Sequence, residues 1–144
     1  MKAKVQTEKI VSLFNEYITA FKQYKLNDVV EYYHLPCTLH TPDKVVLLEK
    51  KAECIQELET IFSQLKQANI RDILAREASY SLVTDHVLLA CIHWTFIDEQ
   101  GETFADFCAI YHVILIGNQL KIINVVSHEL DNLIVLNFPF ELID

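Results

Sequence analysis

The sequence predicts an α+β domain in which helices pack on one face of a strongly bent antiparallel sheet. In the first half of its 144 residues, apolar side chains recur at the three- and four-residue spacing of amphipathic helices. The second half is dominated by long apolar segments that are separated by short turns and have the character of strands. A helix-rich half followed by a strand-rich half is typical of α+β domains, and the length suits a single domain over residues 1–144.

Helices are expected in the first half of the chain. The first begins at Thr7, a good N-cap residue, and its apolar stripe contains Ile10, Leu13, Phe14, Tyr17, Ile18, Phe21 and Tyr24. The second opens at Asn27 and ends before Pro36, because the residue before a proline prefers extended geometry. The third runs from about Lys50 to Ala68.

Strands account for the rest of the chain. Two short ones, over residues 37–41 and 45–48, flank a turn that contains Pro42. Longer strands are expected over 73–83, 87–97, 103–116 and 120–129. The last three are joined by short turns, so they form an antiparallel meander. The apolar tail, residues 133–143, is either a last edge strand or part of a dimer contact.

Composition excludes several classes of partner. The net charge is −8 and no basic run reaches four residues, which argues against nucleic acid. The longest apolar stretches are too short to span a bilayer, so no membrane contact is expected. The first ten residues are not followed by the apolar run of a signal peptide, so a cytoplasmic protein is expected. Neither the four cysteines nor the six histidines show the spacing of a metal site. No phosphate-binding glycine loop is present, and we expect neither metal nor cofactor.

The order of elements and three short segments resemble the NTF2-like superfamily. The segments are Asn27-Asp28-Val29-Val30 at the start of the second helix, Tyr-Tyr-His-Leu-Pro-Cys-Thr-Leu at 32–39, and Gly-Asn-Gln-Leu-Lys-Ile at 117–122. The resemblance covers about residues 7–130. It implies a cone-shaped, cystatin-like fold, in which three N-terminal helices pack on the bent sheet beside a pocket. The superfamily includes ketosteroid isomerase and the SnoaL-type polyketide cyclases.

The resemblance also allows the isomerase positions to be compared with this sequence. The pocket tyrosine of that enzyme falls on Tyr17. Its general base falls on Thr41, and its oxyanion-holding acid falls near Ile110, and neither side chain can perform that role. A steroid isomerase is therefore not expected unless His40 replaces the base.

A ligand pocket is expected between the first helix and the sheet. His40 and Asp106 are the candidate catalytic groups, because histidine titrates near neutral pH and a carboxylate among apolar residues can have a raised pKa. Strand alternation puts Asp106 and His112 on one face of 103–116 and Phe107 and Tyr111 on the other, without deciding which is concave. Alternation in the next strand groups Asn124 and His128 with Ile122. The expected pocket residues are Tyr17, Tyr33, His40, Trp94, Asp106, His112, Asn124 and His128.

Two functions remain open at this point. The first is a non-catalytic homodimer whose cone-shaped cavity binds a small apolar or aromatic molecule. The alternative is a cofactor-independent isomerase, cyclase or dehydratase that uses acid–base catalysis. The homodimer is expected to form through the outer sheet face, because the long strands are apolar on both faces and large exposed apolar patches mark interfaces. The residues without an obvious core position are Cys91, Ile92, Ile114 and Ile116.

Overall fold

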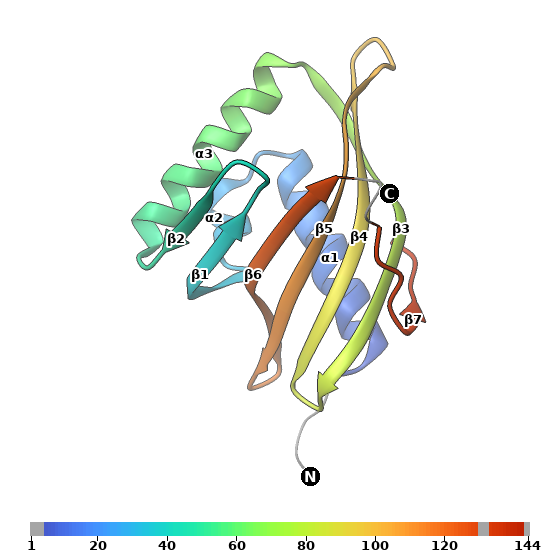
Figure 1. Ribbon diagram of the computed structural model, residues 1–144. Coiled ribbons are helices and arrows are strands. Elements are labelled where there is room, and N and C mark those ends of the chain that lie inside the picture. Colours follow the sequence, from blue (N-terminus) through green and yellow to red (C-terminus); the bar gives the residue numbers. More distant parts are fainter. Residues whose placement is uncertain (1–4, 130–132, 143–144) are drawn as a thin grey trace.

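The computed structural model is a strongly curved sheet with its helices on the concave side (Figure 1). It describes residues 5–129 and 133–142. The helices are α1 (Thr7–Lys22), α2 (Leu26–Val30) and α3 (Lys51–Gln67). The strands are β1 (Tyr33–His40), β2 (Val45–Leu48), β3 (Ile70–Thr84), β4 (Val87–Asp98), β5 (Thr103–Ile116), β6 (Gln119–Glu129) and β7 (Phe138–Pro139). The α+β class predicted from the sequence is confirmed.

The apolar stripe of α1 packs against the concave face of the sheet. Its buried residues are Ile10, Leu13, Phe14, Tyr17, Ile18 and Ala20. The helix ends at Lys22, and Tyr24 follows with a left-handed φ of 55°, which turns the chain toward α2. At the start of α3, the carboxylate of Glu53 accepts the backbone N–H groups of Glu49 (3.1 Å) and Lys50 (3.0 Å) and so caps the first turn.

The sheet is mixed rather than wholly antiparallel, which corrects the sequence expectation. Its strand order is β2-β1-β6-β5-β4-β3-β7, and β1 runs parallel to β6 while the other pairs are antiparallel. The second helix also ends earlier than expected, at Val30. The backbone N–H of Ile122 then donates to the carbonyl of Tyr32 (2.8 Å), and Tyr33 already belongs to β1. Pairing with β6 therefore extends this segment before Pro36 is reached.

The two faces of β5 have different surroundings. Phe107, Ala109, Tyr111 and Val113 point to the concave side and join the core beneath the helices. The ring of Tyr111, for example, packs edge-on against Phe14 of α1, with ring centroids 5.0 Å apart. Because successive side chains alternate, Asp106, Cys108, Ile110 and His112 point to the convex outer face.

A bulge in β6 changes which of its residues share a face. His112 pairs with Asn124 and Val113 pairs with Ile122, so Ile123 is the extra residue. Ile122 therefore lies in the core, fully buried, whereas Asn124 lies on the outer face. Simple alternation grouped these two residues, and the bulge corrects that expectation.

The tail wraps around the β3 edge of the sheet. The backbone N–H of Leu136 donates to Ser79 Oγ (2.9 Å), after which β7 pairs with β3. Phe140 then returns to the core, where its ring stacks on Phe14 with centroids 6.1 Å apart. Together with the core beneath α1, this tail leaves Cys91 and Ile92 only 1% and 0% exposed, so neither needs a partner chain for burial.

Candidate functional site

An apolar cavity of about 190 Å³ lies between α1, α3 and the concave face of the sheet. Strand curvature opens this space, and side chains from helices and strands close it on several sides. The lining residues are Tyr17, Ile18, Phe21, Tyr33, Leu39, His40, Thr41, Lys44, Val46, Glu57, Leu58, Ile61, Ile73, Trp94, Phe96, Phe107, Tyr111, Val125 and Ser127. Because most of these side chains are aliphatic or aromatic, the cavity suits a largely apolar occupant.

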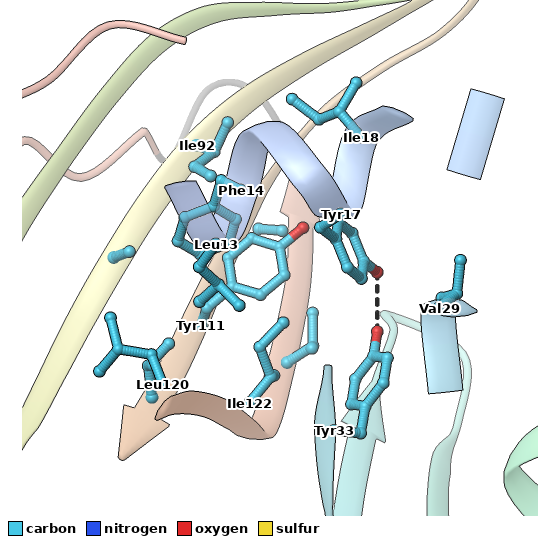
Figure 2. Close-up of a cluster of buried hydrophobic side chains, with 14 of the residues drawn as sticks. Leu13, Phe14, Tyr17, Ile18, Val29, Tyr33, Ile92, Tyr111, Leu120 and Ile122 are labelled. Atoms are coloured by element: carbon cyan, nitrogen blue, oxygen red, sulfur yellow. Dashed lines mark hydrogen bonds between the residues drawn. The ribbon is translucent and has the colours of Figure 1, made fainter. Parts of the chain in front are cut away.

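Two buried polar pairs interrupt the apolar lining at its inner end. Tyr17 of α1 and Tyr33 of β1 point toward one another, with hydroxyl oxygens 2.7 Å apart (Figure 2). On the sheet side, the indole N–H of Trp94 donates to the hydroxyl oxygen of Tyr111 over 2.8 Å. The rings of Tyr17 and Tyr111 also meet edge-on, with centroids 6.4 Å apart. Three phenols and one indole therefore form a connected wall.

All three phenols of this wall are neutral at physiological pH. Burial is the main cause that raises the pKa of Tyr17, Tyr33 and Tyr111 well above the ordinary value, and the neighbouring phenols add to it. The hydrogen bond within the pair also raises the pKa of Tyr17, whereas it opposes the rise at Tyr33. The wall therefore offers neutral O–H groups and no charge.

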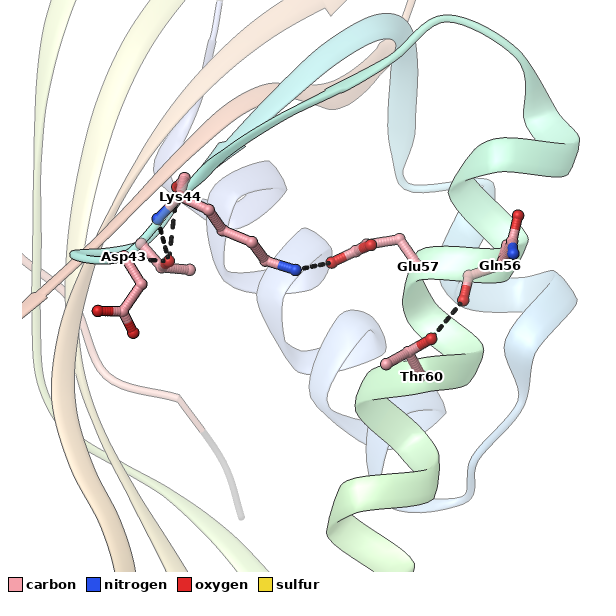
Figure 3. A network of polar contacts seen from close by, with 6 residues as sticks. Asp43, Lys44, Gln56, Glu57 and Thr60 are labelled. Carbon is pink, nitrogen blue, oxygen red and sulfur yellow. Dashed lines mark hydrogen bonds and ion pairs between the residues drawn. The ribbon is translucent and has the colours of Figure 1, made fainter.

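The polar mouth of the cavity lies at the turn between β1 and β2. Lys44 Nζ of this turn lies 3.4 Å from Glu57 Oε1 of α3, and the pair bridges the two elements (Figure 3). The hydroxyl oxygen of Thr41 accepts the backbone N–H groups of Asp43 (3.3 Å) and Lys44 (3.2 Å), which shapes the turn. His40 lines the cavity beside it. Because Lys44 and Glu57 offset one another, their pair adds no net charge to the opening.

Four of the sequence-predicted pocket residues line the cavity. They are Tyr17, Tyr33, His40 and Trp94. The other four, Asp106, His112, Asn124 and His128, lie on the outer face of the sheet, so the structure does not bring them to the cavity. Asn124 has a structural partner there, since its amide donates to Thr38 Oγ1 over 2.7 Å and ties β6 to β1.

Asp106 in particular differs from the sequence expectation. Its Oδ1 lies 2.5 Å from His93 Nε2 and accepts a hydrogen bond from Thr95 Oγ1 over 3.1 Å. The hydrogen bond to His93 lowers the pKa of Asp106, with a smaller contribution from Thr95. The sequence predicts a raised pKa from burial among apolar residues, but this side chain is 39% exposed on the outer face and has His93 as its partner. This pair therefore lies outside the cavity.

Sequence reasoning missed several lining residues. Tyr111 and Phe107 share the alternating apolar face of β5, so their only signal in the sequence was that of core residues. Lys44 and Glu57 are separated by a strand and meet only because the turn folds over α3. No sequence spacing marks such a contact.

The part of the chain that the structure describes contains neither a metal-binding cluster nor a membrane-spanning helix. Within residues 5–129 and 133–142, no three histidine, cysteine or acidic side chains are grouped so as to hold a metal ion. No helix in the same ranges is both long enough and apolar enough to cross a bilayer.

Comparison with known proteins identifies the fold. Residues 7–130 match the family model described as NTF2-like protein (DUF6841). No curated protein matches the sequence significantly.

Three solved structures illustrate the likeness. A domain of unknown function with a cystatin-like fold from Nostoc punctiforme has a TM-score of 0.71 at 15% identity, covering 87% of this chain and 79% of that one. An NTF2-like protein of unknown function from Shewanella oneidensis has a TM-score of 0.69 at 13% identity, covering 84% and 97%. An NTF2-like protein with a cystatin-like fold from Novosphingobium aromaticivorans has a TM-score of 0.69 at 10% identity, covering 87% and 82%. Such identities show the fold alone, and they agree with the resemblance seen in the sequence.

Proposed function

This chain belongs to the NTF2-like protein family DUF6841, and from that premise we propose that it is a cytoplasmic homodimer that binds a small apolar or aromatic molecule in its cavity. The observation that carries the proposal is the apolar cavity itself, which holds about 190 Å³ between α1, α3 and the sheet. An apolar cavity of about 150 Å³ can hold benzene, so this one suits a single substituted ring. The free, buried state of Cys37, Cys54, Cys91 and Cys108 supports a reducing compartment.

Binding of a one-ring hydrocarbon tests the cavity. α-Methylstyrene is expected to bind the purified protein in equilibrium dialysis. Ile61→Trp, which adds bulk to the cavity lining, should abolish most of that binding. Thr60→Trp provides a matched control, because the neighbouring side chain on α3 is exposed and outside the lining. Equal binding by both variants would show that the hydrocarbon sits elsewhere.

The homodimer is proposed to form through the outer sheet face. Exposed apolar residues on β5 support it, since Phe104 and Ile116 remain 51% and 42% exposed and Ile110 lies between them on the same face. We expect a species of about twice the 16.7 kDa chain mass in sedimentation at micromolar concentration. Ile110→Lys should dissociate it, whereas Thr60→Lys on the exposed side of α3 should not. A monomeric wild-type protein would end this part of the proposal.

The alternative is a cofactor-independent isomerase, dehydratase or SnoaL-type cyclase. It is supported by the position of His40, which lines the same cavity as Glu57 and the phenol wall. A histidine in such a place can remove a proton next to a carbonyl group. Exchange of the methyl protons of acetophenone in D₂O, followed by NMR, measures that step. Exchange that is faster with the protein and lost in His40→Gln would favour the enzyme, and no acceleration would favour the binding protein.

A further inference from the structure

We propose that the ligand is an aralkylammonium ion, whose aromatic ring occupies the apolar cavity and whose protonated amine binds Glu57 at the mouth. This inference rests on the proposed cavity function and specifies the charged end of the ligand. Among the described residues that line the cavity, Glu57 of α3 is the one carboxylate, and the inference assigns it to recognition of the amine.

Glu57 places a negative charge at the edge of an apolar cavity. Its side chain is only 21% exposed, so most of it is removed from water. A carboxylate in such a place needs a cation or hydrogen-bond donors close by. Lys44 Nζ lies 3.4 Å from Glu57 Oε1, which is longer than usual for a hydrogen bond to a carboxylate. Because an ionised carboxylate has several acceptor positions, Glu57 can accept further hydrogen bonds from an ammonium group.

The two members of this ion pair differ in how easily they can leave it. Lys44 reaches toward α3 from the turn between β1 and β2, and its side chain is 58% exposed (Figure 3). Its ammonium group can therefore return to water at little cost. Glu57 is held on a helix whose neighbouring side chains, Leu58 and Ile61, line the cavity. A ligand ammonium can thus take the place of the lysine Nζ, whereas a ligand anion cannot displace the Glu57 carboxylate.

The rest of the lining favours a cation over an anion. The face of an aromatic ring carries negative potential, so it attracts a cation and repels an anion. The phenylalanine, tyrosine and tryptophan residues of the lining are Tyr17, Phe21, Tyr33, Trp94, Phe96, Phe107 and Tyr111. The net charge of −8 acts in the same direction at longer range. The same rings suit the aromatic body of the ligand.

Equilibrium dialysis at neutral pH tests the inference with two probes of similar shape. The first is 2-phenylethylamine, which is protonated because alkylamines of this kind have a pKa of about 10. The second is n-propylbenzene, in which a CH₃ group replaces the ammonium group. Glu57→Gln keeps the shape of the side chain and removes its charge. It should lower the affinity for 2-phenylethylamine by about tenfold or more, the value of a hydrogen bond to a charged group, without weakening the binding of n-propylbenzene.

Two further variants separate recognition from a structural role of the ion pair. Lys44→Met removes the competing cation and keeps an unbranched side chain, so the affinity for 2-phenylethylamine should rise by about twofold to fivefold. If the pair only held the turn against α3, this variant would weaken binding as Glu57→Gln does. Glu59→Gln is the matched control, because Glu59 is exposed on the same helix and lies outside the lining, and it should change neither affinity.

Different failures have different meanings. The amine inference is wrong, and the cavity function stands, if n-propylbenzene binds but 2-phenylethylamine does not, or if Glu57→Gln leaves the amine affinity unchanged or lowers both affinities equally. Tighter binding of 3-phenylpropanoate, which carries a carboxylate in place of the amine, would also overturn it. If none of the probes binds, the proposed cavity function fails and this inference fails with it.

Discussion

The buried Tyr17–Tyr33 pair makes a quantitative prediction about stability. Each single substitution to Phe keeps the aromatic ring but leaves the partner hydroxyl with no hydrogen bond in the pair, whose oxygens are 2.7 Å apart. Leaving a buried polar group unpaired costs about 1–3 kcal/mol. When both residues become Phe, no orphan remains, and the free energy of unfolding should return to within about 1 kcal/mol of wild type. The double variant should therefore lose at least about 1 kcal/mol less than the two single losses combined, and this difference is the coupling of the pair.

Urea unfolding measures this coupling directly. Trp94, the one tryptophan of the chain, reports on the transition by fluorescence, because its indole lies in the same wall. The wild type, both single variants and the double variant form a closed thermodynamic cycle at neutral pH without ligand. If the double variant loses the sum of the two single losses, the hydroxyl groups do not act as a pair and the reasoning is refuted.

Three further predictions concern pH, thiol reactivity and the tail. Above about pH 10, tyrosines ionise in the unfolded chain, whereas the buried ones keep their protons in the folded chain. Each tyrosine with a raised pKa therefore leaves the free energy of unfolding unchanged below about pH 10 and lowers it by up to about 1.4 kcal/mol per pH unit above about pH 10. In urea titrations from pH 8 to 11, the free energy of unfolding should fall less steeply for Tyr111→Phe than for wild type. Burial raises the pKa of Cys37 to about 12 and that of Cys108 to about 11. A thiol reagent at pH 8 should therefore label the native chain slowly and the urea-unfolded chain quickly. Equally fast labelling of both states would contradict the burial of these cysteines. Phe140→Ala, which empties a core position, should lower the free energy of unfolding by about 3–5 kcal/mol. Phe138 is half-exposed, so Phe138→Ala should lower it by about 1 kcal/mol or less. Similar melting temperatures for the two variants would contradict the packing of the tail against the core.

The local pattern of apolar residues allowed most helices and strands to be predicted from the sequence. The stripe from Ile10 to Phe21 repeats with the helical period, and the segment 103–116 coincides with β5 as the structure has it. Both signals depend only on neighbouring residues, because helical and strand periods place side chains at fixed angles along one segment. The end of the second helix was predicted less accurately, because Tyr33 pairs with β6, which is distant in sequence, and so belongs to a strand.

Part of the candidate site could also be predicted, because some of its residues lie in segments with a clear helical or strand period. Tyr17 and Trp94 belong to segments whose type was clear, and the family resemblance supplied the pocket position of Tyr17. Asp106 and His112 were sorted correctly onto one face of their strand. Which face of β5 the helices cover, however, depends on how α1 docks, and no period within the strand contains that information.

The sequence by itself determined the α+β class, the order of elements, the amphipathic stripe of α1 and the two alternating faces of β5. Only the tertiary structure decided that β1 runs parallel to β6, that a bulge at Ile123 separates Ile122 from Asn124, and that Tyr17, Tyr33 and Tyr111 meet at one wall. The physical reason is the range of the forces involved. Periodicity and turn chemistry act between near neighbours, whereas strand direction, register and convergence of side chains are set by burial of the whole chain against itself.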